Sequence, residues 1–213
     1  CKLMEWGHRL SFAYLSRWEG EEDALSALAE HLIQTGGLLC SSCQVIFLDT
    51  DALGEGEAFC RSFLPLLERA ADRFRAALGE KGEGSLYAWE TRLEHAADRL
   101  PGTLFPGRGC SLTLREDREL ELSPLHGNVL VKCLPQKALL PVLRRQKGRL
   151  QTAGLLQDRP ALTQLLARAG VTRIAPPGSM SRTLSGEGHD GEFPLRRYVR
   201  TVDIQEPSPD RPI

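Results

Sequence analysis

The sequence lacks any apolar run that approaches the roughly 18 to 20 residues of a membrane-spanning helix. It also lacks an excess of charge, because 27 basic and 28 acidic residues give a formal net charge of −1. A nucleic-acid-binding protein usually needs a basic surface, so this balance argues against that class. Aromatic residues reach only 6%, but 41% hydrophobic and 26% charged residues are ordinary for a globular protein. We therefore expect a folded protein that neither spans a membrane nor binds nucleic acid.

The beginning of the chain lacks a secretion signal. Residues 1–6 do not combine a basic start with an apolar run and a small-residue cleavage site. The chain also does not begin with methionine, of which it contains only two. We therefore expect a cytoplasmic protein and a chain that is part of a longer one, with a portion preceding Cys1.

Six cysteines are present, and in a secreted protein an even number would suggest disulfides. Without a signal peptide, and with 213 residues available to build a core, reduced thiols are the better prediction. The cysteines are Cys1, Cys40, Cys43, Cys60, Cys110 and Cys133.

Apolar runs that predict strands alternate with amphipathic segments that predict helices. Strands are expected over residues 10–15, 44–48, 111–114, 129–134, 150–155 and 171–174. Helices are expected over residues 21–34, 57–78, 85–100, 138–145 (with Pro141 in the first turn) and 158–169. Loops are expected over residues 101–109 and 175–192, and no tight hairpin is expected between strands. This alternation predicts an α/β fold with a mostly parallel sheet flanked by helices, formed by residues 1–204 and followed by a flexible tail, 205–213.

Cys40 is the candidate reactive residue. It follows the glycines 36 and 37, which are expected to end a helix, and we expect it at that helix end, just before strand 44–48. Such junctions expose reactive groups on a rigid support, and nearby backbone N–H groups favour the thiolate. With Cys43 it also forms a C-x-x-C pair, but no second pair at zinc-ligand spacing follows, and the surrounding elements do not fit a redox motif. A structural thiol remains the alternative.

Five short motifs occur in order along the chain. They are residues 6–13 (WGHRLSFA), 40–44 (CSSCQ), 150–154 (LQTAG), 170–180 (GVTRI, then PGSM) and 189–200 (HDG, then VR). This succession resembles the C-terminal half of LuxC-type fatty acyl-CoA reductases, a branch of the aldehyde dehydrogenase superfamily, over nearly the whole chain. The resemblance implies an aldehyde-dehydrogenase-like catalytic domain, with most of the coenzyme domain upstream.

The resemblance also implies roles for three residues. The family usually reads Cys-Ser-Ser-Pro-Gln around its nucleophile, so Cys40 takes the nucleophile position and Cys43 stands where proline is common. That departure would permit a Cys40–Cys43 disulfide. Residues 5–9 resemble the superfamily's Glu-Leu-Gly-Gly-Lys strand, which makes Glu5 a candidate catalytic carboxylate, the alternative being a surface carboxylate. Glu121 stands where a superfamily glutamate contacts the nicotinamide ribose, the alternative being a plain loop carboxylate.

The implied chemistry is attack of the Cys40 thiolate on an acyl-CoA or acyl-protein thioester, followed by hydride transfer from NADPH and release of a fatty aldehyde. The Cys40 backbone N–H is a candidate donor to the negatively charged oxygen that develops. The implied partners are acyl-transferring or synthetase proteins and further copies of the chain, as in bioluminescence-related reductases, and no metal is expected. Two other functions stay open: an aldehyde dehydrogenase that forms acid, and a non-catalytic α/β module.

Overall fold

A computed structural model describes residues 7–78, 83–157 and 159–204. The strands are β1 (Leu10–Leu15), β2 (Cys43–Leu48), β3 (Thr103–Gly107), β4 (Cys110–Arg115), β5 (Asn128–Cys133), β6 (Leu150–Leu155) and β7 (Arg173–Ala175). The helices are α1 (Glu22–Thr35), α2 (Leu53–Leu78), α3 (Glu83–Ala96), α4 (Gln136–Arg144) and α5 (Pro160–Ala169), with short 3-10 turns η1 (Pro177–Ser179) and η2 (Pro194–Arg197).

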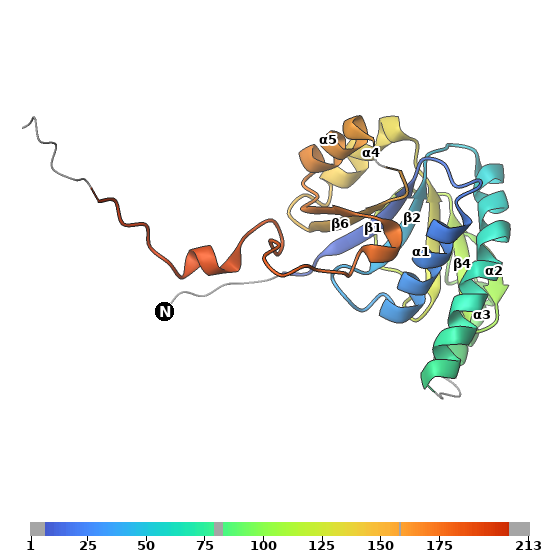
Figure 1. Ribbon diagram of the computed structural model, residues 1–213. Helices are drawn as coiled ribbons and strands as arrows, with labels where there is room; N and C mark the ends of the chain where they lie inside the picture. Colours follow the sequence, from blue (N-terminus) through green and yellow to red (C-terminus); the bar gives the residue numbers. More distant parts are fainter. Residues whose placement is uncertain (1–6, 79–82, 158, 205–213) are drawn as a thin grey trace, which may run out of the picture.

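The seven strands form one sheet in the order β3-β4-β5-β2-β1-β6-β7. Neighbouring strands are parallel except for β3 and β4 (Figure 1). The predicted α/β class with a mostly parallel sheet is confirmed. None of the helices in the described ranges is long and apolar enough to cross a membrane.

Helices cover both faces of the sheet, which explains why its central strands are continuous apolar runs. Side chains alternate along β1: Ala13 and Leu15 join the core beneath α1 and α2, whereas Phe12 and Tyr14 join the core beneath α4 and α5. Figure 1 shows these two helical layers on opposite sides of the strands. The sheet is therefore a rigid support for the loops at its edges.

The end of α1 determines where the chain turns back towards the sheet. Gly36 adopts a left-handed conformation with φ of 57°, and its N–H donates to the carbonyl of Leu32 at 3.1 Å. Glycine takes this conformation without a Cβ penalty, so the predicted helix stop is confirmed. The acidic residues Glu22 and Asp23 occupy the first turn, where the helix dipole favours negative charge.

The prediction of a loop over residues 101–109 is wrong, as is the prediction that no tight hairpin occurs. β3 pairs antiparallel with β4, and residues 108 and 109 form a two-residue turn with Gly109 at φ of 70°. Pro106 and two glycines suggested a loop, but β3 lies at the edge of the sheet, where proline is tolerated because its missing N–H is not needed.

Other boundaries also differ from the expectation. α2 begins at Leu53 rather than at residue 57, and α3 ends at Ala96 rather than at residue 100. Pro141 lies inside α4, beyond its first turn, because the helix begins earlier than predicted. The predicted tail, 205–213, lies outside the described residues.

Candidate active site

Cys40 lies in a turn between α1 and β2, close to where the parallel strands begin. The turn is closed by two hydrogen bonds: the Ser42 N–H donates to the carbonyl of Leu39, and the Leu39 N–H donates to Ser42 Oγ, both at 2.9 Å. α1 ends at Thr35, so Cys40 is on the connecting turn and not at the helix end as predicted. The Cys40 side chain is exposed on a backbone that its neighbours hold in place.

A buried hydroxyl attaches this turn to the sheet. Ser11 Oγ donates to the carbonyl oxygen of Cys40 at 2.7 Å and accepts the Thr152 N–H at 3.0 Å. The pairing of β1 with both neighbouring strands is irregular beside Ser11, which gives its side chain room between β2 and β6. The position of Cys40 is therefore tied to β1 and β6.

Two backbone donors in the turn are available to a ligand. In the part of the chain that the structure describes, the N–H groups of Cys40 and Ser41 donate to no acceptor. Free N–H groups beside a reactive thiol suit the stabilisation of a negatively charged oxygen. The Cys40 N–H named as a candidate donor in the sequence is thus joined by the Ser41 N–H.

Cys40 also borders a cavity of about 80 Å³ whose opposite wall comes from a segment about 150 positions later in the chain. Asp190, with a side chain only 3% exposed, anchors that segment. Its carboxylate accepts from Arg9 Nε at 2.9 Å and from Gln151 Nε2 at 2.6 Å. The residues that line the cavity are Cys40, Ser41, Gln151, Thr152, Thr172, Arg173, Met180, Thr183, Gly188, His189 and Asp190. Four of the five sequence motifs thus meet at one place.

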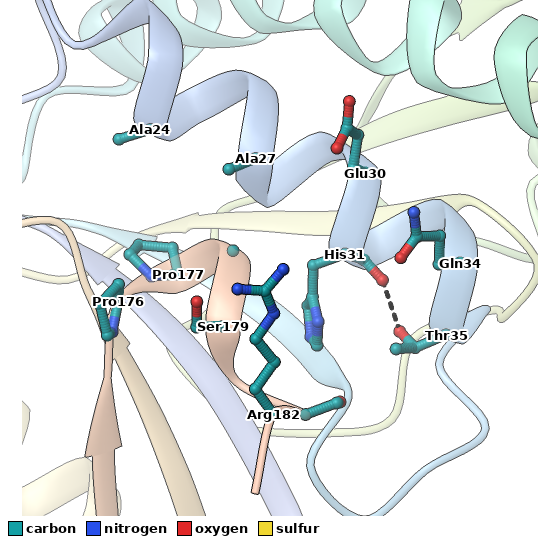
Figure 2. Close-up of a pocket in the computed structure, with 12 residues that line it drawn as sticks. Ala24, Ala27, Glu30, His31, Gln34, Thr35, Pro176, Pro177, Ser179 and Arg182 are labelled. Atoms are coloured by element: carbon teal, nitrogen blue, oxygen red, sulfur yellow. Dashed lines mark hydrogen bonds between the residues drawn. The ribbon is translucent and has the colours of Figure 1, made fainter.

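A larger hollow of about 450 Å³ lies between α1 and residues 176–182 (Figure 2). His31 projects from α1 at its wall and is buried, and its Nε2 accepts the Cys43 N–H at 3.4 Å. Burial lowers the pKa of His31 to about 4, so the imidazole is neutral at physiological pH. Ser41 and Ser181 share a hydroxyl–hydroxyl bond of 2.8 Å, which connects the Cys40 turn to the wall of this hollow.

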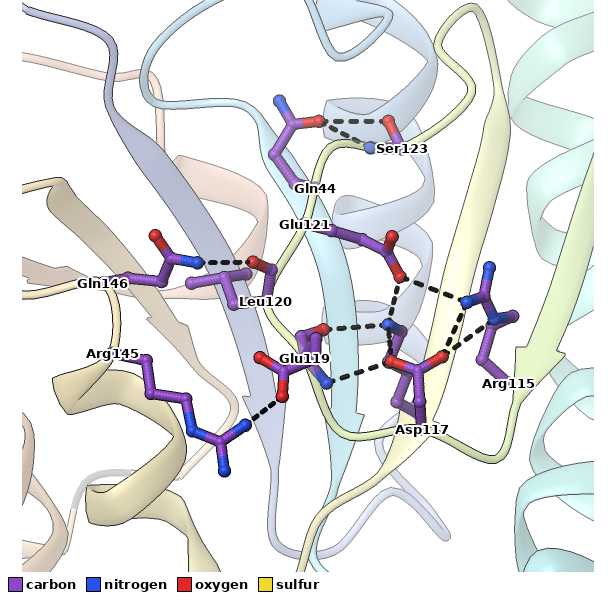
Figure 3. Close-up of polar contacts among 10 residues, drawn as sticks. Gln44, Arg115, Asp117, Glu119, Leu120, Glu121, Ser123, Arg145 and Gln146 are labelled. Carbon is purple, nitrogen blue, oxygen red and sulfur yellow. Dashed lines mark hydrogen bonds and ion pairs between the residues drawn. The ribbon is translucent and has the colours of Figure 1, made fainter.

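Gln44 connects the Cys40 turn to the loop between β4 and β5. Its Nε2 donates to the carbonyl of Gly37 at 2.8 Å, and its Oε1 accepts both the N–H and the hydroxyl of Ser123 at 3.1 Å (Figure 3). The His126 N–H also donates to the carbonyl of Gly36 at 2.8 Å. The loop that carries Glu121 is thereby attached to the turn that carries Cys40.

Glu121 itself belongs to a charged cluster around Lys132 (Figure 3). Its Oε1 pairs with Lys132 Nζ and lies 3.7 Å from Arg115 Nη2, while Asp117 Oδ1 lies 2.5 Å from the same ammonium. The Lys132 side chain is fully buried. Burial by itself would raise the pKa of Asp117, but hydrogen bonds from Lys132 and the Glu119 N–H, with the charges of Lys132 and Arg115, hold it below its usual range.

Glu121 is not among the residues that line the Cys40 cavity. Its Oε2 has no partner among the described residues, and the side chain is 40% exposed. One carboxylate oxygen is therefore fixed while the other can accept from a ligand hydroxyl.

Glu5 lies outside the described residues. Within the described ranges, no three histidine, cysteine, aspartate or glutamate side chains are grouped to hold a metal ion.

The other described cysteines differ from Cys40 in being buried. Burial raises the pKa of the Cys43, Cys60 and Cys110 thiols to about 12 each and also raises that of Cys133. A thiol must ionise to act as a nucleophile, so burial makes these four poorer nucleophiles near neutral pH. All five described cysteines are free thiols. Cys43 is part of the core beneath α1 and α2, and a disulfide to Cys40 would require it to leave that core.

Comparison with solved structures identifies the fold. Delta-pyrroline-5-carboxylate dehydrogenase from Mycobacterium tuberculosis superposes with a TM-score of 0.55 and 14% identity, over 84% of this chain and 36% of that chain. The same enzyme bound with NAD and cobalamin gives a TM-score of 0.53 and 12% identity, over 85% of this chain and 36% of that chain. A mutant of proline utilization A from Bradyrhizobium japonicum superposes with a TM-score of 0.50 and 12% identity, over 84% of this chain and 20% of that chain. The chain therefore has the fold of part of these dehydrogenases.

The chain spans only about a third of the length of the first of these dehydrogenases. No protein with a curated function matches it in sequence. The acyl-CoA reductase (LuxC) family, however, matches over residues 1–201, which is nearly the whole chain and includes all five motifs. On that match, this chain is a member of the LuxC acyl-CoA reductase family.

Proposed function

We propose that the intact protein carrying this chain reduces a fatty acyl thioester, of coenzyme A or of an acyl-protein, to a fatty aldehyde through an acyl group on Cys40. The observation that carries the proposal is the setting of Cys40. It is the exposed thiol of the five described cysteines, and its turn holds two free N–H donors beside a cavity. Membership of the acyl-CoA reductase family supports the choice of substrate.

The first step is attack of the Cys40 thiolate on the thioester carbonyl carbon. The new S–C bond pushes the carbonyl electron pair onto oxygen, where the N–H groups of Cys40 and Ser41 stabilise it. Collapse of this intermediate breaks the bond to the departing thiolate and leaves the acyl group on Cys40. The hydrogen bond from Ser11 to the Cys40 carbonyl keeps the peptide oriented throughout.

NADPH, when bound, supplies the hydride that converts the acyl group to the aldehyde level. Glu121 is the proposed contact of this chain with the coenzyme, because its unengaged Oε2 can accept from ribose hydroxyls. Lys132 and Arg115 contact the other oxygen and so orient the carboxylate. Most of the coenzyme site belongs to the remainder of the protein. Glu5 stays a proposed catalytic carboxylate on the family resemblance.

We also propose that the protein is cytoplasmic, forms homo-oligomers and receives acyl groups from transferase or synthetase partners. Support for association comes from residues 184–204, which extend away from the sheet domain (Figure 1). Exposed apolar side chains are concentrated there, and such patches usually mark contacts with another protein surface. These are Leu184, Phe193, Leu195, Tyr198, Val199, Val202 and Ile204.

The test is incubation of the intact protein with a fatty acyl-CoA in the absence of coenzyme, followed by peptide mass spectrometry. The acyl group is expected on Cys40, in the wild type and in the matched Cys43→Ala variant, and NADPH should then release aldehyde. An adduct on Cys43, or no adduct on any cysteine, contradicts the proposal. Rapid oxidation of aldehyde to acid with no reduction of acyl-CoA would favour the aldehyde dehydrogenase function instead.

A further inference from the structure

Thr152, on β6, has a side chain that the fold leaves without a partner. Its Oγ1 is the one buried side-chain nitrogen or oxygen atom in the described ranges that makes no hydrogen bond. The residue is only 1% exposed. A buried hydroxyl without a partner costs about 1–3 kcal/mol, so an unpaired one is rare and calls for an explanation.

The polar groups next to Thr152 are all satisfied. Gln151 donates to Asp190 at 2.6 Å, and its carbonyl accepts the N–H and the hydroxyl of Thr172 at 3.0 and 3.2 Å. The Thr152 N–H is bonded to Ser11 Oγ. A loosely packed region would leave several groups unpaired, whereas here a single hydroxyl is left over in an otherwise complete network.

Thr152 is one of the residues that line the cavity beside Cys40. Only Ser11 separates the two backbones, because its hydroxyl donates to the Cys40 carbonyl at 2.7 Å and accepts from Thr152 at 3.0 Å. The cavity, at about 80 Å³, has room for a carbonyl group and a few methylenes but not for a long acyl chain. A hydrogen-bond donor on one of its lining residues is thus close to where the reacting end of a substrate would lie.

We propose that the Thr152 hydroxyl donates a hydrogen bond to the acyl oxygen of the thioester that reacts with Cys40. The inference rests on the proposed function and adds a side-chain donor to the backbone N–H groups of the turn. As the Cys40 sulfur bonds to the carbonyl carbon, the C=O electron pair moves onto oxygen, and Thr152 shares its proton with that oxygen without transferring it. The pair then re-forms the carbonyl and expels the thiolate, so the hydroxyl ends the step unchanged.

The experiment measures two rates on the intact protein without coenzyme: acylation of Cys40 by a fatty acyl-CoA and alkylation of Cys40 by iodoacetamide. Alkylation develops no charge on an acyl oxygen, so it reports only on the thiol. Thr152→Val keeps the side-chain shape and removes the donor, and acylation should slow by about 100-fold, as for other oxyanion donors, with alkylation unchanged. Thr152→Ser should restore most of the acylation rate.

Thr113→Val is the matched control, because Thr113 is a buried threonine on β4 whose hydroxyl contacts His95 Nε2 at 3.2 Å. It should leave both rates unchanged. Thr152→Ala removes the same hydroxyl and gives the same readout if the valine variant does not fold.

Three results would overturn the inference. An acylation rate of Thr152→Val equal to that of the wild type would mean that the hydroxyl hydrogen-bonds only to an internal water. Equal slowing of acylation and alkylation would mean that Thr152 acts by placing the thiol. Acylation of wild-type protein at another residue, or at none, would refute the proposed function together with this inference, whereas the first two results refute the inference alone.

Discussion

The Cys40 turn and the Lys132 cluster are both polar regions held by buried side chains, but they use those side chains differently. Around Cys40 the supporting bonds join neutral groups, such as the Ser11 hydroxyl and the Cys40 carbonyl. They leave a thiol, two N–H groups and one hydroxyl unpaired. Around Lys132 the ammonium is paired with Asp117 and Glu121, and one oxygen of Glu121 remains. In both regions, then, a few polar groups are left unpaired while their neighbours bond to one another.

The two regions are joined by the loop between β4 and β5. Glu121 in this loop bonds to Lys132, and two residues later Ser123 bonds to Gln44 beside the Cys40 turn. Open parallel sheets usually bind ligands at the carboxyl ends of their strands. Here Cys40 lies at the amino end of β2, because α1 returns the chain to that edge and stops at Gly36. The loop between β4 and β5 therefore links the Lys132 cluster to the edge of the sheet where Cys40 lies.

Removal of the Cys40 thiol should have the largest effect. Cys40→Ala is expected to lower the rate of aldehyde formation from acyl-CoA by at least about 1,000-fold, since loss of a covalent nucleophile is rarely replaced. Cys43→Pro should keep most of the activity, because Cys43 begins a strand and its N–H makes only a long bond to His31, at 3.4 Å. Activity retained by Cys40→Ala in this assay would exclude the nucleophile assignment.

Much of the fold could be predicted from local patterns. The apolar run at residues 10–15 and the glycine after α1 gave the positions of β1 and of the helix end, because both depend on neighbouring residues. The β3–β4 hairpin could not be predicted, because Pro106 fits a strand only at a sheet edge, and edge position depends on the assembled sheet.

The candidate site was predictable only in part. Cys40 and the motif at residues 189–191 were apparent from the sequence, but not their meeting at one cavity. The unpaired hydroxyl of Thr152 gave no sequence signal, since an unsatisfied group is recognised only when all of its neighbours are known. Lys132 in a β-strand gave no indication that it is fully buried among carboxylates.

Breaking the Lys132 cluster should affect stability more than any other change in the two regions. Lys132→Met leaves Asp117 and Glu121 without their cation. We expect the free energy of unfolding to fall by about 3 kcal/mol. This value is at the low end of the range for buried ion pairs because both carboxylates are partly exposed. Urea unfolding at neutral pH measures this loss. The exposed pair of Lys137 with Asp51 is the control, and Lys137→Met should cost well under 1 kcal/mol.

The same variant should change the acid sensitivity of the protein. The pKa of Asp117 is lowered in the folded state, so its ionisation contributes stability above the ordinary value of about 4, and that contribution is lost as pH falls through the folded pKa. Lys132→Met removes one of the groups that lower the pKa of Asp117. The free energy of unfolding should therefore fall less steeply as the pH drops below about 4. An unchanged acid profile would show that Lys132 does not stabilise the Asp117 carboxylate.

His31 provides a smaller, pH-dependent effect beside the Cys40 turn. Its folded pKa of about 4 lies below the unfolded value of about 6.5, so the unfolded chain binds the proton more readily and stability falls as pH drops through this interval. We expect a loss of about 2 kcal/mol between pH 7.5 and 5, which His31→Gln should largely abolish. A residual slope from His95 should remain, because burial lowers its pKa as well. The exposed His8 is the control, and His8→Gln should keep the full slope.

The smallest expected effect concerns the charge at the Cys40 cavity. Asp190→Asn keeps a carbonyl oxygen for Gln151, but it removes the charge that faces Arg9, a side chain 20% exposed, and leaves the Arg9 Nε–H without its acceptor. Arg9 keeps some contact with solvent, so stability should fall by about 1–2 kcal/mol, less than for Lys132→Met. Asp190→Ala should cost more, because it also leaves the Gln151 amide without its acceptor at 2.6 Å. Urea unfolding of the three variants tests this order. A cost for Asp190→Asn equal to that of Lys132→Met would show that the Cys40 region, like the Lys132 cluster, depends on charge and not on neutral hydrogen bonds.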